Sequence, residues 1–171
     1  MVDIYLRKNL RSLICVFFMC LLTPYARAQK TDIKFTHLSI NEGLSHLVTN
    51  FIDQDKNGFI WVGSDDGLNK FDGYHFKIYR NIPDDDNSLS DNIVTCFLQE
   101  ENGTIWVGTH GGLNKINPLN DKITRYFSNR KDSTSLSDNL IRTLVKDPDG
   151  YIWIGTENGL NKFDPKTAKT T

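Results

Sequence analysis

The chain alternates short apolar runs with tight polar turns, and one such arrangement occurs three times. Its centre is an apolar run that contains a tryptophan, found at Phe59–Val62, Ile105–Val107 and Tyr151–Ile154. Each run follows a turn that contains Asn-Gly or Asp-Gly, a strong hairpin signal because glycine accepts a positive φ without steric cost. A strand with one wet face would alternate apolar and polar residues. These continuous runs therefore predict strands that are covered on both faces.

The three copies align almost without gaps, and Trp61, Trp106 and Trp153 are 45 and then 47 residues apart. Each copy predicts a first strand, a hairpin turn, the tryptophan strand and a Leu-Asn-Lys strand, and the first two copies also predict a fourth strand. The expected first strands are Val48–Gln54, Ile93–Gln99 and Leu140–Lys146, and the expected fourth strands are Phe76–Arg80 and Ile123–Phe127. No stretch after residue 28 shows sustained helical periodicity. A period of this length with four strands per copy predicts an all-β fold, the β-propeller.

The repeats divide the chain into segments. We expect propeller blades at residues 44–88 and 89–135, and a truncated third blade at residues 136–171 whose fourth strand would begin where the sequence stops. Residues 29–43 are expected to form a linker and a strand, Ile33–Ile40, of the kind that closes the last blade of a ring. The predicted fold is thus an incomplete propeller, with two complete four-stranded blades, most of a third and one closing strand.

Residues 1–28 have the features of a signal peptide. Arg7, Lys8 and Arg11 give a basic start, Leu10–Leu22 is largely apolar, and Ala26-Arg27-Ala28 fits the small-x-small cleavage pattern. A membrane anchor is the alternative, but the apolar run is shorter than the about 20 residues that span a bilayer. We therefore expect cleavage before Gln29 and export to the periplasm.

Removal of this leader changes the charge and the cysteine content. The full chain has 20 basic and 21 acidic residues, of which the leader holds four basic and one acidic, so 16 and 20 remain and the net charge is −4. Because no basic patch stands out, no nucleic-acid partner is expected. Cys15 and Cys20 leave with the leader. The remaining Cys96 lies between apolar neighbours, which favours a buried small side chain over a reactive thiol.

The repeats resemble the two-component regulator propeller family. The residues that carry the resemblance are Asp55-x-Asn57-Gly58-x-Ile60-Trp61-Val62-Gly63 followed by Gly67–Asp72, their two copies, and the Leu-Ser-Asp-Asn segments that begin at Leu89 and Leu136. In the first copy His46-Leu47 replaces Asp-Asn. The resemblance covers about residues 33–171, essentially all of the chain after the leader.

The resemblance implies a function in sensing. Family members use seven-bladed propellers as the periplasmic sensor of histidine kinases anchored in the inner membrane, many of them hybrid systems of Bacteroidetes that detect glycan fragments. It implies an oligosaccharide ligand, further C-terminal blades and kinase domains as partners, and a homodimer of the full-length protein. For this chain it implies ligand sensing in signal transduction and no enzymatic activity of its own.

Candidate ligand contacts are the positions that differ between copies, because binding residues in repeat folds are concentrated in loops. In the turn between the second and third strands these residues are Asp65, Asp66, His110, Glu157 and Asn158. Further candidates lie at the start of the first strands, namely Ser45-His46, Asp91-Asn92 and Asp138-Asn139.

Positions that recur in every copy are expected to be structural. The tryptophans could stack on sugars, but identical sites inside continuous apolar strands favour packing between blades, together with the glycines two residues later, Gly63, Gly108 and Gly155. Trp106 is expected to be the most covered, because its blade alone has a neighbour on each side. Turn chemistry favours hydrogen bonds from Asn69, Asn114 and Asn161 to backbone over ligand contact.

The sequence supports a metal site or an enzymatic function less well than it supports ligand sensing. Asp53–Gly58 matches the first half of a calcium loop, but Ser64 occupies the position where that loop needs a bidentate Glu. The four histidines lack zinc-ligand spacing, so no metal or cofactor is expected. A propeller-class glycan lyase or hydrolase is the alternative, and it would need paired carboxylates that face one pocket. A non-functional gene remnant is a third interpretation.

Overall fold

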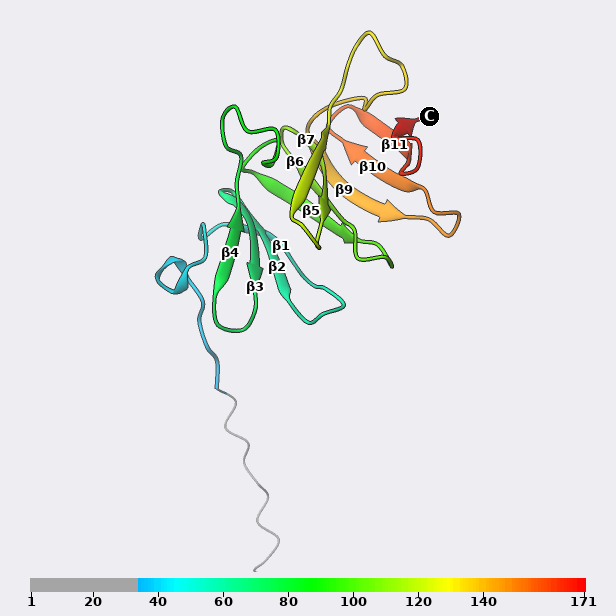
Figure 1. Ribbon diagram of the computed structural model, residues 1–171. Coiled ribbons are helices and arrows are strands. Elements are labelled where there is room, and N and C mark those ends of the chain that lie inside the picture. Colours follow the sequence, from blue (N-terminus) through cyan, green and yellow to red (C-terminus); the bar gives the residue numbers. More distant parts are fainter. Residues whose placement is uncertain (1–33) are drawn as a thin grey trace, which may run out of the picture. The chain divides into compact units, whose positions relative to one another are not determined.

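The computed structural model describes residues 34–171, so the predicted signal peptide and its cleavage site lie outside the described residues. Residues 37–171 form one compact unit. Three four-stranded antiparallel sheets make up most of it (Figure 1), which confirms the predicted all-β propeller architecture. Among residues 34–171, no helix is both long enough and apolar enough to cross a membrane.

Within each sheet the strands follow one another in chain order. Sheet 1 contains β1 (Thr49–Gln54), β2 (Ile60–Ser64), β3 (Gly67–Phe71) and β4 (Phe76–Tyr79). Sheet 2 contains β5 (Val94–Gln99), β6 (Ile105–Thr109), β7 (Gly112–Asn117) and β8 (Lys122–Tyr126). Sheet 3 contains β9 (Ile141–Lys146), β10 (Ile152–Thr156), β11 (Gly159–Asp164) and β12 (Lys169–Thr170). The strands predicted from the repeats are present, with ends that differ by one or two residues.

The hairpin between β1 and β2 shows why the sequence folds this way locally. Gly58 has a φ of 87° and its N–H donates to the Asp55 carbonyl at 2.9 Å, a conformation that favours glycine. The Asp55 carboxylate accepts hydrogen bonds from the N–H groups of Asn57 and Phe59 and, at 2.8 Å, from Nε1 of Trp61. The acidic residue that resembled a calcium ligand therefore closes the turn and holds the indole.

Each sheet has two different apolar faces, because side chains alternate along a strand. On the tryptophan face, Trp61 and Leu68 of sheet 1 correspond to Trp106 and Leu113 of sheet 2 and to Trp153 and Leu160 of sheet 3. On the aliphatic face, Ile60 and Val62 correspond to Ile105 and Val107 and to Ile152 and Ile154.

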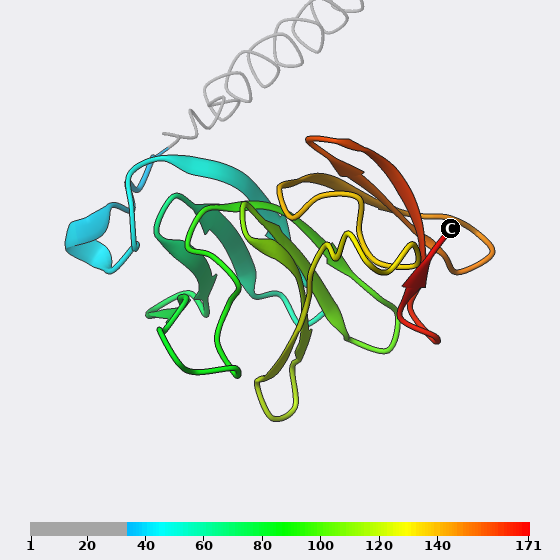
Figure 2. The ribbon, with the colours of Figure 1, turned by 90° about the horizontal axis from the view of Figure 1, so that it is seen from above.

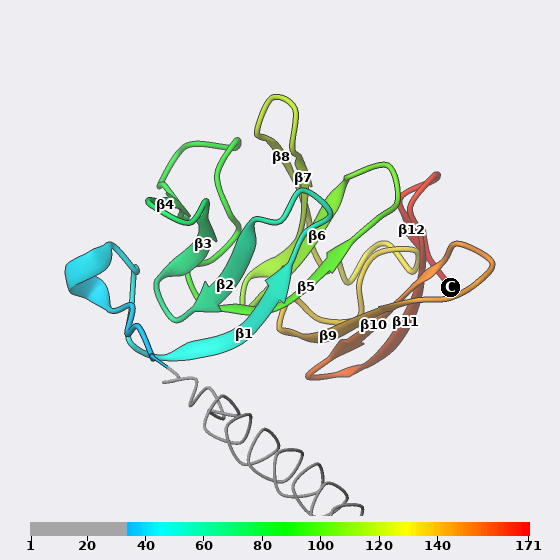
Figure 3. The ribbon, with the colours of Figure 1, turned by 90° about the horizontal axis from the view of Figure 1, so that it is seen from below.

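Two apolar cores hold the sheets together, one between each pair of neighbours. In the first, Trp61, Leu68 and Tyr79 pack against the aliphatic face of sheet 2. In the second, Trp106 and Leu113 pack against the aliphatic face of sheet 3. The first strands β1, β5 and β9 consequently lie in succession along one side of the molecule, as the view from below shows (Figure 3).

Sheet 2 therefore lies between the other two, and both of its faces are covered. The view from above shows the same order of the sheets along the chain (Figure 2). The exposed fraction is 1% for Trp61 and 0% for Trp106, but 36% for Trp153. The expectation that Trp61 would be less covered than Trp106 is wrong, because its indole points toward sheet 2 and away from the open side of sheet 1.

The structure differs from the sequence prediction at both ends. Residues 34–39 have no regular secondary structure, and Ile40–Glu42 form a 3₁₀ helix, η2, so the predicted closing strand is wrong over its described part; Ile33 lies outside that part. Ser39 and Glu42 form a capping box and Gly43 ends the turn with a φ of 105°, a local signal that the sequence carried. Each sheet already has four strands, so none lacks the strand that this segment would have supplied. Sheet 3 includes a fourth strand of two residues, β12, where the sequence predicted none.

Candidate functional site

The candidate ligand residues lie in three equivalent turns, which link β2 to β3, β6 to β7 and β10 to β11. A hydroxyl group closes each turn in the same way. The hydroxyls of Ser64, Thr109 and Thr156 donate to the carbonyls of Gly67, Gly112 and Gly159, all at 2.9 Å. The structure therefore places Asp65, Asp66, His110, Glu157 and Asn158 at the same end of their respective sheets. We call this end the turn rim.

The recurring asparagines tie the start of each first strand to this rim. The carboxamide oxygens of Asn69, Asn114 and Asn161 accept from the N–H groups of Ser45, Ser90 and Ser137 at 2.8–2.9 Å. Their amide nitrogens donate to carbonyls of the neighbouring strand, for example Asn69 to Val62 at 3.1 Å. These side chains are buried, and backbone groups supply most of their hydrogen bonds, with serine hydroxyls as further acceptors. This agrees with the turn chemistry expected from the sequence.

The polar residues at the strand starts are also engaged with backbone. Asp91 and Asp138 each accept from an N–H group two residues further on at 2.7 Å, and His46 Nδ1 accepts from Val48 at 3.1 Å. The carboxamide oxygens of Asn92 and Asn139 accept from N–H groups of the preceding linkers. These candidates shape the chain where it enters a sheet.

A β-bulge in each first strand supplies residues that the sequence analysis missed. Asn50, Thr95 and Arg142 are the unpaired residues of these bulges, and a bulge re-aims its side chain. Asn50 donates to Asp65 at 3.0 Å, and Arg142 donates to Glu157 at 2.6 Å. The two residues of each pair are 15 positions apart in the sequence. This spacing identifies the pairs only when the position of the bulge is known.

Two further candidates have partners as well. Asp66 accepts from Arg80 at 3.0 Å, and Asn158 donates to Asp138 at 3.5 Å. His110 differs from all of them. Its backbone N–H donates to the Ile93 carbonyl at 3.0 Å, but its imidazole has no hydrogen-bond partner within residues 34–171. The bulge residue of its sheet, Thr95, donates instead to the Ile141 carbonyl of sheet 3 at 2.7 Å.

Most polar side chains of the rim are paired with one another. Its carboxylates are held by an arginine or an asparagine, and no three His, Cys, Asp or Glu side chains among residues 34–171 gather in a way that could hold a metal ion. A catalytic site would need a nucleophile, a base and an orienting group within reach of one another. The rim presents a row of polar side chains, most of them held by hydrogen bonds within their sheet. The His110 imidazole has no such bond within residues 34–171 and can accept or donate one.

The tryptophans lie away from this rim, near the start of the second strand of each sheet. Their indole Nε1 atoms donate to Asp55, Glu100 and Asp147 at 2.8, 3.1 and 3.1 Å. The amino groups of Lys70, Lys115 and Lys162 lie 5.3–5.7 Å from the centres of the same rings, within the range of cation–π attraction. Because Trp61 and Trp106 are buried between sheets, neither offers a face on which a sugar could stack.

Two of the three repeats match the sequence profile of a known family. Residues 88–111 and 135–158 match the sequence profile of the family described as Two component regulator propeller. A stretch of 64 residues, 37% of this chain and 5% of the relative, is 50% identical to Histidine kinase P4 of Formosa agariphila.

Similar proteins occur among the solved structures, and two of them are extracellular domains. One is the extracellular domain assigned to a hybrid two component system of B. thetaiotaomicron; it matches 80% of this chain and 19% of that domain with 30% identity and a TM-score of 0.73. Another extracellular domain of the same organism, assigned to a one component system, matches 75% of this chain and 18% of that domain with 23% identity and a TM-score of 0.64, a likeness of fold alone. This chain thus spans about a fifth of the length of the first domain and about a twentieth of the kinase.

Proposed function

Because this chain carries repeats of the two-component regulator propeller family, we propose that it is part of the extracytoplasmic sensor of a histidine kinase system and contributes to binding a glycan fragment. The observation that carries the proposal is the family match of two repeats, together with the likeness to an extracellular two-component domain. The chain resembles such a sensor propeller and not a catalytic core.

The turn rim supports a polyhydroxyl ligand. Binding sites combine a rigid scaffold with a small number of polar groups that fix the orientation of the ligand. Here the scaffold is the row of hydroxyl-closed turns, and the polar groups are carboxylates already paired within their sheets. An ion-paired carboxylate or an asparagine can still bond to a sugar hydroxyl without the cost of burying an unpaired charge. Among the five candidates, His110 is the residue whose side chain has no hydrogen-bond partner in the part of the chain from residue 34 onward.

Calorimetric titration with a panel of size-defined neutral and acidic oligosaccharides tests this proposal. We expect one class of oligosaccharide to bind, and His110→Ala to weaken that binding about two- to tenfold, the effect of losing one hydrogen bond. His75→Ala is the matched control, because His75 is exposed and lies in the turn between β3 and β4, at the opposite end of its sheet. Failure of every oligosaccharide to bind, or equal losses in the two variants, would contradict the proposal.

Export is tested separately. Expressed with its leader in a Gram-negative host, the protein should be recovered outside the cytoplasm with Gln29 as its first residue, because Ala26-Arg27-Ala28 fits a cleavage site. Mass spectrometry of the intact protein gives the answer directly. A chain that is exported but still begins at Met1 would support the membrane anchor instead.

A further inference from the structure

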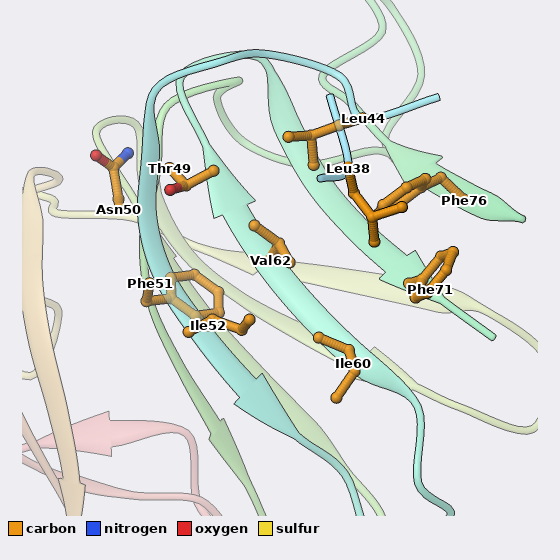
Figure 4. Close-up of a pocket in the computed structure, with 10 residues that line it drawn as sticks. All are labelled: Leu38, Leu44, Thr49, Asn50, Phe51, Ile52, Ile60, Val62, Phe71 and Phe76. Carbon is orange, nitrogen blue, oxygen red and sulfur yellow. The ribbon is translucent and has the colours of Figure 1, made fainter. Parts of the chain in front are cut away.

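Two of the hollows on the molecule differ in their chemistry. An apolar groove of about 580 Å³ follows the aliphatic face of sheet 1, where Ile60 and Val62 of β2 lie between Ile52 of β1 and Phe71 of β3 (Figure 4). The equivalent faces of sheets 2 and 3 pack against a tryptophan face, so this groove is a packing surface of the same kind. A smaller pocket lies between sheets 2 and 3, and polar side chains contribute to its lining.

The first sheet-to-sheet contact shows what normally occupies the place of this smaller pocket. Between sheets 1 and 2, Asp121 of sheet 2 accepts hydrogen bonds from the Tyr79 hydroxyl at 2.6 Å and from Lys77 at 2.7 Å. Tyr79 stacks beside Trp61 and is 8% exposed. The tyrosine hydroxyl of this contact is therefore paired with a side chain of the next sheet.

The second contact keeps the tyrosine and lacks both of its partners. Tyr126 pairs across its sheet with the same leucine position as Tyr79. Ala168 precedes the fourth strand of sheet 3 as Asp121 precedes that of sheet 2, and the two residues have left-handed φ values of 58° and 55°. Thr124 stands where the first contact has its lysine. An ion pair and a hydrogen bond have thus been replaced together by small uncharged side chains.

A pocket of about 310 Å³ lies at this place between sheets 2 and 3. Tyr126, Phe127, Phe163 and Ala168 are among its lining residues. The Tyr126 hydroxyl has no hydrogen-bond partner within residues 34–171. Burial raises the pKa of Tyr126, so its hydroxyl stays protonated at neutral pH and can donate. The pocket therefore offers a hydrogen-bond donor among aromatic side chains.

The linker between sheets 2 and 3 adds polar side chains to the lining, Asn129 and Asp132. Thr134 donates its N–H and its hydroxyl to the same Asp132 oxygen at 2.9 and 2.7 Å. The other oxygen of this carboxylate and the amide nitrogen of Asn129 have no hydrogen-bond partner in the described part of the chain. Arg125, which also lines the pocket, is paired with Asp86. The pocket thus presents unpaired donors and an unpaired acceptor.

We propose that this pocket binds one neutral sugar ring, at a site separate from the turn rim. A hydroxyl group can accept from Tyr126 and can also donate to Asp132, which a group that only accepts cannot do. The aromatic rings suit the apolar C–H face of a sugar, and the volume lies at the lower end of the range of about 300–1,000 Å³ for ligand pockets. None of the five candidates of the turn rim lines the pocket.

The charge of the pocket favours a neutral sugar over an acidic one. The hydrogen bonds from Thr134 lower the pKa of Asp132, so its carboxylate is ionised at neutral pH and repels an anion. The lysine that accompanies the carboxylate of Asp121 in the first contact has no counterpart here. A bound sugar would contact Tyr126 of sheet 2 and Ala168 of sheet 3, and would join the two sheets as Asp121 joins sheets 1 and 2.

Nuclear magnetic resonance titration of the exported chain tests this site. The probes are glucose, galactose and mannose, each matched with its uronate. We expect at least one hexose to shift the amide signals of Ala168 and Thr170 in a saturable way, and its uronate to bind at least about twofold more weakly because of charge repulsion. Shifts confined to the amide of His110 and its neighbours would support the turn rim and overturn the site proposed here.

Three variants test the role of individual side chains, and circular dichroism verifies the fold of each. Tyr126→Phe removes the hydroxyl alone and should weaken binding about two- to tenfold. The double variant Thr124→Lys with Ala168→Asp rebuilds the cluster of the first contact, and we expect it to abolish binding by filling the pocket. Aspartate tolerates the left-handed φ at this position, as Asp121 shows. Ala168→Gly is the matched control, since it leaves the space open, and should bind as the unaltered chain does.

Several results would overturn the proposal. They are the absence of shifts at Ala168 and Thr170 with every hexose, equal binding of a hexose and its uronate, and unchanged binding by Tyr126→Phe. Unchanged binding by the folded double variant would overturn it as well, because that variant has no space left for a ring.

Discussion

The three tryptophans are equivalent in sequence and unequal in environment. Trp61 and Trp106 are buried between sheets, whereas Trp153 lies on an uncovered face. Replacing either of the first two by alanine should lower the free energy of unfolding by about 3–5 kcal/mol, through lost burial and the cavity left behind. Trp153→Ala, the internal control, should cost less than about 1 kcal/mol. Urea unfolding measures all three, and equal losses would show that the tryptophans do not pack between sheets as described.

Cys96 is the only thiol among the described residues, and it faces the contact between sheets 2 and 3. Burial raises the pKa of its thiol to about 11, with smaller opposing effects from Thr95 and Gly108. The reactive thiolate is therefore scarce near neutral pH. At pH 8, we expect Cys96 of the folded chain to react with a thiol reagent far more slowly than Cys96 of the chain unfolded in urea. Rapid labelling of the folded chain would mean that sheets 2 and 3 separate readily.

Between elements, an acidic side chain joins sheet 1 to sheet 2. Asp121, in the turn before β8, accepts hydrogen bonds from Lys77 at 2.7 Å and from the Tyr79 hydroxyl at 2.6 Å, both on β4. Two hydrogen bonds, the larger effect from Lys77 and the smaller from Tyr79, lower the pKa of Asp121 below its ordinary 3.8. Burial, with a contribution from Asp121, raises the pKa of Tyr79. The contact therefore depends on an ionised carboxylate.

This contact predicts a pH dependence of stability. Because the pKa of Asp121 is lower in the folded chain, its stabilising effect is present above 3.8 and is lost as the pH falls through the folded-state pKa. Asp121→Asn should therefore lower the urea midpoint at pH 7, and the difference from the unaltered chain should shrink below pH 3.8. Asparagine tolerates the φ of 55° at this position. Asp149→Asn, in the exposed turn before β10, should show neither effect; a difference independent of pH would refute the electrostatic cause.

Across the whole molecule, stability should follow the coverage of the sheets. Each sheet contacts mainly its neighbours, as in other repeat folds, and sheet 2 alone is covered on both faces by sheets of this chain. Hydrogen exchange should be slowest for the amides of β6 and β7. It should be faster in β10 and β11 and fastest in the two-residue β12. Uniform protection of the three sheets would mean that they unfold as one cooperative unit.

The sequence by itself determined the sheets. Hairpin formation depends on neighbours along the chain, so turns such as Asp55–Gly58 and apolar runs such as Phe59–Val62 locate the strands within one or two residues. The repetition then indicated the architecture, because three equivalent segments support the same strand assignment where one segment alone would leave it ambiguous. The repetition also located the turn rim, since residues such as His110 differ between copies whose flanking residues are nearly the same.

Only the tertiary structure decided which way each side chain faces and what it meets there. The alternation along β2 directs Trp61 to sheet 2, which a count of neighbouring repeats cannot reveal. The bulges that bring Asn50 to Asp65 and Arg142 to Glu157 insert one residue into the pairing, and no local preference marks that position. The segment before Ile40 is apolar enough for a strand, but a strand also needs a partner with which to pair, and residues 34–39 pair with none of the three described sheets. Local interactions fix turns and strands, whereas direction, partners and coverage depend on contacts between residues far apart in the chain.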